Sequence, residues 1–151
     1  YTIERPIHMG AIIANEKAPL ELLSKFGSPL GEAFQLRDDV LGVIGDSKNT
    51  GKPVGDDIRE GKFTLLLAYA IENANIADQK LLDRRGSDDI TQVEIEKITS
   101  IIINGGALEA VESKIKKLYD EAIGSLDILN SNETAIKLAK SLAGYVCWRE
   151  A

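Results

Sequence analysis

Apolar residues recur at intervals of three and four along most of the chain, and this periodicity constrains the fold more than any other feature. The clearest stripe lies in the segment 107–129 and consists of Leu108, Val111, Ile115, Leu118, Ala122, Leu126 and Leu129. Residues at this spacing share one face of an α-helix. The pattern therefore predicts an all-α protein whose amphipathic helices each bury one face.

Further segments carry the same helical pattern, namely 1–14, 19–44, 63–73, 91–103 and a last helix that Ser131 or Asn132 could cap. Ser28-Pro29 interrupts the second of them. Because proline breaks a helix interior but suits its first turn, we expect one helix to end near Gly27 and another to be capped by Ser28. The glycine-rich, charged segment 45–62 predicts a long polar loop, which in a compact domain is usually functional.

Composition narrows the function classes. The chain has 151 residues, which is the size of one domain. A net charge of −6 without a basic stripe excludes nucleic-acid binding, and no apolar run reaches the roughly 18 residues of a membrane span. A single cysteine, Cys147, excludes an intramolecular disulfide and is typical of a reducing, cytoplasmic protein. Since residues 1–14 already look like the body of a helix, we expect the chain to be part of a longer protein.

On a helical wheel, the segment 34–46 separates into an apolar face and a polar face. The polar face is an arc of roughly 120° that holds Gln35, Asp38, Asp39, Gly42, Gly45 and Asp46. Neighbouring carboxylates repel unless a cation lies between them. Oxygen ligands suit Mg²⁺, which usually bridges to substrate phosphates. The face is thus a candidate metal site, and a solvated acidic surface is the alternative interpretation.

Two lysines, Lys52 and Lys62, follow this acidic face, and we expect them to return toward it. A lysine ammonium is a point charge suited to phosphate. Carboxylates followed by lysines indicate a site where metal ions and cations together hold a polyanion. On composition alone, surface ion pairs of these lysines with Asp56, Asp57 and Glu60 remain the alternative.

The stretches 34–46 (FQLRDDVLGVIGD) and 50–64 (TGKPVGDDIREGKFT) resemble the second aspartate-rich region of the trans-isoprenyl diphosphate synthases, the polyprenyl synthetases of geranylgeranyl and farnesyl type. Residues 1–6 (YTIERP) are similar to the helix after the family's Lys-Thr motif, and residues 147–149 to its C-terminus. The resemblance covers essentially the whole chain but only the C-terminal half of a family member. It implies one all-α region, 1–151, that forms the C-terminal half of the isoprenoid synthase helical bundle, with the N-terminal half absent.

The resemblance also implies an activity. Family members are prenyltransferases of isoprenoid biosynthesis that condense an allylic diphosphate with isopentenyl diphosphate after Mg²⁺-assisted ionisation. Their Mg²⁺ ions lie between two aspartate-rich motifs, and only one is present here, so we expect the 151 residues alone to be inactive. Family members are commonly homodimers, so the resemblance implies a homodimer of the intact protein. The alternative is a non-catalytic helical subunit of a heteromeric prenyl diphosphate synthase that acts through protein contacts.

The resemblance assigns roles to the acidic helix position by position. Asp38 would bind Mg²⁺ directly, and Asp39 would support that site directly or through water. Gln35 would lie beside the allylic substrate and the developing cation. The family most often has Asp-Asp-x-x-Asp, and its last position is Gly42 here, which removes one possible water-mediated ligand.

Roles for the following segment come from the same resemblance. Lys52 and Lys62 would hold the allylic diphosphate. Asp46 and Asp57 would bind waters or these lysines. Because the segment is one residue longer than in short-chain farnesyl enzymes, Asp56 is the alternative to Asp57.

Overall fold

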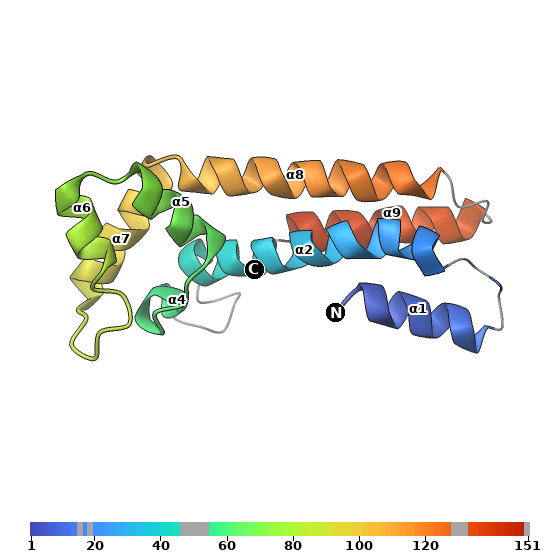
Figure 1. Ribbon diagram of the computed structural model, residues 1–151, viewed down its shortest axis with the longest axis horizontal. Coiled ribbons are helices and arrows are strands. Elements are labelled where there is room, and N and C mark those ends of the chain that lie inside the picture. Colours follow the sequence, from blue (N-terminus) through green and yellow to red (C-terminus); the bar gives the residue numbers. More distant parts are fainter. Residues whose placement is uncertain (15–16, 18–19, 46–54, 128–132, 150–151) are drawn as a thin grey trace. The chain divides into compact units, whose positions relative to one another are not determined.

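The computed structural model describes residues 1–14, 17, 20–45, 55–127 and 133–149. These ranges form eight helices (Figure 1): α1 (Glu4–Ile13), α2 (Leu20–Ile44), α4 (Asp56–Arg59), α5 (Leu65–Asn73), α6 (Ile76–Leu82), α7 (Gln92–Asn104), α8 (Ala107–Leu126) and α9 (Glu133–Trp148). They contain no strand, so the predicted all-α class is confirmed. Within them, no helix combines the length and apolarity that crossing a membrane requires.

The chain divides into two compact units. The first unit comprises Tyr1–Arg37 and Lys114–Arg149, and the second contains Asp38–Ser113. Helices α2 and α8 contribute residues to both units. Asp38 and Asp39 of α2 belong to the second unit, as does α4, so this unit contains the acidic part of the predicted site.

The first unit is held together by one apolar stripe from each of three helices. The buried residues are Phe26, Leu30, Ala33 and Leu36 in α2, Ile115, Leu118, Ala122 and Leu126 in α8, and Ala143, Val146 and Cys147 in α9. They recur mostly at three- and four-residue spacing, so each helix buries a single face. Helices α2 and α9 run side by side (Figure 1), and the Arg149 guanidinium lies 4.3 Å from the Phe34 ring centroid. The stripe predicted over 107–129 is thus confirmed up to Leu126.

Helix α2 passes through Pro29 without a break, so the predicted helix end near Gly27 and the new start at Ser28 are wrong. Proline has no N–H to donate to the carbonyl four residues earlier. Burial outweighs this loss, because Phe26 and Leu30 on either side of Pro29 are 4% and 0% exposed. Tertiary packing of a helix face commonly overrides local propensity in this way.

The second unit confirms the helices predicted over 63–73 and 91–103. Helix α7 begins with a capping box, in which Thr91 Oγ1 accepts a hydrogen bond from the Glu94 N–H and the Glu94 carboxylate accepts one from the Thr91 N–H at 2.8 Å. Thr64 caps α5 with one hydrogen bond, which its Oγ1 accepts from the Leu67 N–H at 3.3 Å. The core of this unit consists of Val40, Val43, Ile58, Leu66, Leu67, Ala70, Leu82, Ile90, Ile95, Ile98, Ile102, Ala107 and Val111.

One short helix, α6, was not predicted. Its N-cap is Asn75, whose Oδ1 accepts hydrogen bonds from the Ala77 and Asp78 N–H groups at 2.9 and 3.0 Å. Asparagine is a strong N-cap and was the available signal, but a seven-residue helix shows little periodicity. The predicted caps of the last helix, Ser131 and Asn132, lie outside the described residues.

Candidate functional site

The end of α2 has one packed face and one polar face, as the helical wheel predicts. Val40 and Val43 are buried, whereas Asp38 is exposed and Asp39 is half-buried. The packing weakens at the end of the helix, where Ile44 is 37% exposed. Two consecutive carboxylates therefore stand at the surface of the second unit.

The segment predicted as a continuous polar loop contains a helical turn, α4, so that part of the prediction is wrong. The turn ends in a Schellman motif. The Lys62 N–H donates to the Asp57 carbonyl at 3.0 Å, and the Gly61 N–H donates to the Ile58 carbonyl at 3.2 Å. Gly61 has a φ of 70°, the left-handed conformation that this motif requires and that glycine adopts without strain. The motif turns the chain back so that Lys62 lies beside Asp57.

Lys62 and Asp57 form an ion pair across this turn. Lys62 Nζ lies 2.5 Å from Asp57 Oδ1 and 3.0 Å from Glu60 Oε2. Asp57 is 6% exposed, whereas the Lys62 side chain is 43% exposed. The hydrogen bond to Asp57, followed by that to Glu60, raises the pKa of Lys62 and keeps its amine charged. A buried carboxylate is thereby neutralised by an ammonium that still reaches solvent.

The exposed ammonium retains capacity for a further anion. An ammonium group has three N–H donors. Two of those of Lys62 point to Asp57 and Glu60. Among the described residues the third N–H has no partner. It can therefore donate to an oxygen that approaches from solvent, and a phosphate oxygen suits a lysine point charge.

Asp57 lies against α2 at Gly42. A β-carbon built on Gly42 would lie 3.0 Å from Asp57 Oδ1 and nearer still to Cγ and Oδ2. Gly42 follows Asp38 by four residues, about 6 Å along the helix axis and on the same face. The Asp57 carboxylate therefore occupies the space beside Asp38 into which a side chain at position 42 would project. In this way Asp38, Asp57 and Lys62 come to one region of the second unit.

The position of the turn depends on a contact that the sequence analysis missed. The Gly86 N–H donates to the Ile58 carbonyl at 3.0 Å, and a β-carbon on Gly61 would lie 2.9 Å from Gly86 Cα. Arg85 stacks over the Phe63 ring at 5.6 Å. The turn that contains Arg85 and Gly86 therefore packs against the turn that carries Lys62. Two glycines were visible in the sequence, but only the fold brings them together.

Of the three remaining predicted site residues, two fall outside the described residues and the third lies on α2. Lys52 and Asp46 fall in 46–54, outside the described residues. Gln35 is exposed on α2, three residues before Asp38. That spacing is the one at which side chains are neighbours on a helix surface.

The donor set suits Mg²⁺ shared with a diphosphate. Within the described ranges, no three His, Cys, Asp or Glu side chains gather closely enough to hold a metal ion by themselves. Asp38 and Asp39 place two adjacent carboxylates on the surface of α2, where each also interacts with another group of the protein, and Asp57 is bonded to Lys62. Mg²⁺ commonly takes one or two carboxylates and completes its shell with water and substrate phosphates. The residues present fit one side of such a shared site.

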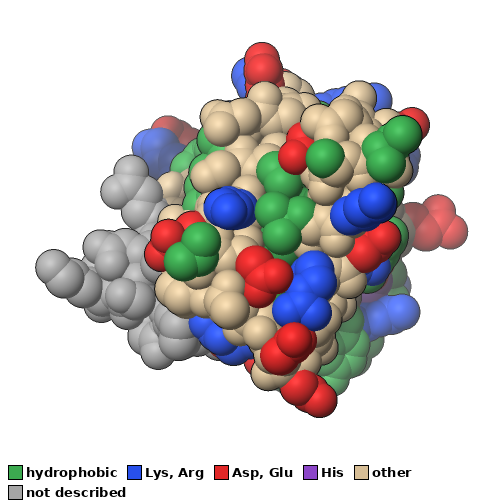
Figure 2. Space-filling model, turned by 90° about the vertical axis from the view of Figure 1, so that its left-hand side faces the viewer, with side chains coloured by type: hydrophobic (Ala, Val, Ile, Leu, Met, Phe, Trp, Pro, Cys, Tyr) green, Lys and Arg blue, Asp and Glu red, His purple; other side chains and the backbone are tan. Residues whose placement is uncertain are grey.

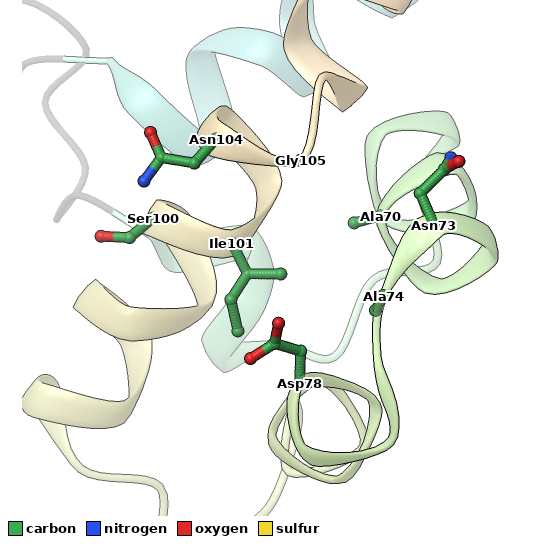
Figure 3. Close-up of a pocket in the computed structure, with 8 residues that line it drawn as sticks. All are labelled: Ala70, Asn73, Ala74, Asp78, Ser100, Ile101, Asn104 and Gly105. Atoms are coloured by element: carbon green, nitrogen blue, oxygen red, sulfur yellow. The ribbon is translucent and has the colours of Figure 1, made fainter.

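A separate hollow lies between α5, α6 and α7, where the Asp78 carboxylate faces Ile101 (Figure 3). Its lining consists of Ala70, Asn73, Ala74, Asp78, Ser100, Ile101, Asn104 and Gly105. Two of its polar side chains are hydrogen-bonded to main-chain carbonyls. Asn73 Nδ2 donates to the Tyr69 carbonyl and Ser100 Oγ donates to the Glu96 carbonyl, both at 2.8 Å. No lysine or arginine is among these lining residues, so the hollow does not complement a diphosphate.

The surface over α6 and α7 carries acidic and basic side chains interspersed (Figure 2). Arg84 lies 3.0 Å from Asp89 and 3.1 Å from Glu94. The contact with Arg84 lowers the pKa of Asp89, and hydrogen bonds from the Thr91 backbone and from Arg84 lower the pKa of Glu94. Charges paired in this way leave little net field for a polyanion. The Asp38, Asp57 and Lys62 region therefore remains the candidate site.

Comparison with known proteins identifies the family. The sequence model of the family described as polyprenyl synthetase matches residues 1–102. A geranylfarnesyl diphosphate synthase from Aeropyrum pernix is 40% identical over 80% of this chain, and a geranylgeranyl diphosphate synthase from Saccharolobus solfataricus is 38% identical over 93%. The crystal structure of a geranylgeranyl pyrophosphate synthase from Corynebacterium glutamicum, complexed with isoprenyl diphosphate and magnesium, superposes on 99% of the chain with a TM-score of 0.94 and 39% identity.

The matches cover only part of each relative. The chain spans 37% of the Aeropyrum protein and 43% of the Saccharolobus protein, and it covers 43% of the Corynebacterium chain. The family match nevertheless includes α1 to α6 and nearly all of α7. It therefore contains the acidic face of α2 and the Asp57–Lys62 pair. The chain belongs to the polyprenyl synthetase family.

Proposed function

We propose that this chain supplies one side of the active site of a prenyltransferase, a prenyl diphosphate synthase that condenses an allylic diphosphate with isopentenyl diphosphate. The names of its relatives support this activity, as does the isoprenyl diphosphate and magnesium complex of the Corynebacterium enzyme. The single observation that carries the proposal is the Asp57–Lys62 pair, which lies against the acidic face of α2 one turn beyond Asp38.

In the proposed reaction, the bond between the allylic carbon and the diphosphate oxygen breaks, and its electron pair leaves with the diphosphate. The double-bond electrons of isopentenyl diphosphate form the new carbon–carbon bond, and loss of a proton restores a double bond. Magnesium, when bound, neutralises the charge that grows on the leaving diphosphate. Groups aimed at such developing charge contribute most in the transition state.

The side chains of this chain have distinct roles in the proposal. Asp38 holds the metal, and Asp39 supports it. Lys62 donates its third N–H to a diphosphate oxygen while Asp57 keeps the ammonium oriented. The Gln35 amide oxygen faces the allylic carbons, where positive charge develops.

Other parts of the proposal rest on the family resemblance. Lys52 would contact the same diphosphate, and Asp46 would bind waters or lysines. Half of the active site, with the first aspartate-rich motif, would come from a chain region N-terminal to these 151 residues. A homodimer and a cytoplasmic location also remain predictions.

The test is Asp38→Asn in the intact protein, with Glu32→Gln as the matched control. Both change a carboxylate of α2 to an amide, and Glu32 pairs with Lys114 at 2.8 Å. We expect Asp38→Asn to lower kcat by about 10²-fold or more, the size of effect seen when one transition-state contact is lost. The control should remain within about twofold of the unmodified protein. Near-normal turnover of Asp38→Asn would remove Asp38 from the metal site and favour a non-catalytic subunit that acts through protein contacts.

A further inference from the structure

We propose that Gly42 is a positioning residue of this site: the absence of a side chain there admits the Asp57 carboxylate to the acidic face of α2, and Asp57 in turn holds Lys62. The effect of Gly42 on catalysis rests on the proposed function. The geometric part of the inference concerns only Gly42, Asp57 and Lys62 of the second unit and can be tested without substrate.

The contact between Gly42 and Asp57 leaves no room for a β-carbon. An added β-carbon would lie 3.0 Å from Oδ1 and would overlap both Cγ and Oδ2. Contacts as close as these force a neighbour to move, and this neighbour is not the free end of a flexible side chain. The Asp57 carboxylate is buried and bonded to Lys62.

The backbone that carries Asp57 is held on both sides. The Asp57 carbonyl accepts the Lys62 N–H at 3.0 Å, and the next carbonyl, of Ile58, accepts the Gly86 N–H at 3.0 Å. Gly61 and Gly86 approach so closely that neither has space for a β-carbon. A side chain at position 42 would therefore displace the Asp57 carboxylate rather than move the whole turn.

Displacement of Asp57 would release Lys62. The hydrogen bond to Asp57 is the largest cause of the raised Lys62 pKa. Without this hydrogen bond, the Lys62 amine would titrate at lower pH and its side chain would sample more rotamers. The place beside position 42 is thus filled by a carboxylate from α4 that is already joined to a lysine.

The experiment compares Gly42→Ala with Gly31→Ala in the intact protein. Both substitutions add one methyl group to α2, but among the described residues a β-carbon at Gly31 would meet only Ile3, at an ordinary 3.8 Å. Acetylation of Lys62 by an N-hydroxysuccinimide ester is followed by peptide mass spectrometry without metal or diphosphate, with Lys137 as internal reference. We expect Gly42→Ala to label at least about tenfold faster than the unmodified protein, because the neutral fraction of an amine rises about tenfold for each unit by which its pKa falls.

A double-mutant cycle with Asp57→Ala separates positioning from general damage. In the Asp57→Ala background the obstacle to a β-carbon is gone, so Gly42→Ala should change neither Lys62 labelling nor kcat/KM further. Gly42→Asp, which restores the commonest family motif, should lower kcat/KM more than Gly42→Ala does, since it adds a second carboxylate to the space of Asp57. Gly31→Ala should leave both readouts within about twofold.

The outcomes separate this inference from the proposed function. Unchanged Lys62 labelling in Gly42→Ala, or additive losses in the double variant, would overturn the positioning role. If Gly42→Ala does not fold, the double variant should still fold as well as Asp57→Ala does. Failure of the double variant to fold would also overturn the positioning role of Gly42. If labelling rises as expected while kcat/KM of Gly42→Ala is unchanged, Gly42 has no positioning role in catalysis and Lys62 does not bind the diphosphate.

Discussion

Arg37 donates a hydrogen bond of 2.7 Å from Nε to the main-chain carbonyl of Cys147. Arg37 is buried in the first unit, and its guanidinium lies 5.6 Å from the Trp148 ring centroid. A carbonyl in the last turn of a helix has no partner within the helix. One arginine therefore caps the end of α9 and joins it to α2 directly before the first catalytic carboxylate of the proposal.

Arg37→Met should lower the free energy of unfolding by about 2 kcal/mol, since hydrogen bonds to charged groups contribute about 1.5–3 kcal/mol. Methionine preserves much of the aliphatic packing, so the loss reports on the polar contacts. Urea denaturation measures the change. Arg5→Met, at an exposed position of α1, is the control and should alter stability by less than about 0.5 kcal/mol. Equal effects of the two substitutions would contradict a structural role for the Arg37–Cys147 bond.

Lys62→Ala should raise the KM for the allylic diphosphate about tenfold or more in the intact protein, because in the proposed site it removes a charged hydrogen-bond donor to the diphosphate. Lys80→Ala removes an exposed lysine of α6 and serves as control. Steady-state kinetics with varied allylic diphosphate give the comparison. A KM that changes no more than in the control would count against phosphate binding by Lys62.

Glu94→Gln should reduce stability at neutral pH and flatten its decline in acid. Hydrogen bonds from the Thr91 backbone, from Arg84 and from the Thr91 hydroxyl lower the pKa of Glu94 from 4.5 to about 2 in the folded protein. A carboxyl with a lowered folded pKa stabilises fully above its unfolded pKa, and this stabilisation is lost as the pH falls from 4.5 toward 2. Thermal melts across that window test the prediction. Glu96→Gln, on the same helix, should leave the acid slope unchanged.

The Cys147 thiol should resist alkylation in the folded protein. Burial raises its pKa to about 11, and the nearby Arg37 and Arg149 only partly oppose this. Since the thiolate is the reactive form, iodoacetamide at pH 8 should modify Cys147 slowly before unfolding and rapidly in urea. Peptide mass spectrometry at Cys147 reads out both states. Rapid modification of the folded protein would mean that the last turn of α9 opens readily.

The 151 residues alone should not turn over isopentenyl and allylic diphosphates with Mg²⁺. They span less than half of each relative compared here and contain one aspartate-rich motif. A radiolabelled product assay on the purified chain, beside the intact protein, measures this directly. Prenyl diphosphate formation by the isolated chain would show that one motif suffices.

Much of the fold could be predicted from patterns among residues that are close together in the sequence. The all-α class, the helices of 91–103 and 107–126, and the exposed Asp38 with buried Val40 and Val43 all follow from periodicity and capping. These signals arise from residues within a turn or two of each other. Where the signal weakened, the prediction failed, as with the short helices α4 and α6.

The sequence by itself determined the all-α class, the helices α5, α7 and α8, and the face of α2 that carries acids, because helix periodicity and end capping are local properties of neighbouring residues. Only the tertiary structure decided that α2 continues through Pro29, that Asp57 fills the space left by Gly42, and that Gly61 meets Gly86. Each of these depends on the burial of side chains or on the approach of backbones that are distant in the chain. Such contacts are set by how the packed faces fit together, which no local pattern encodes.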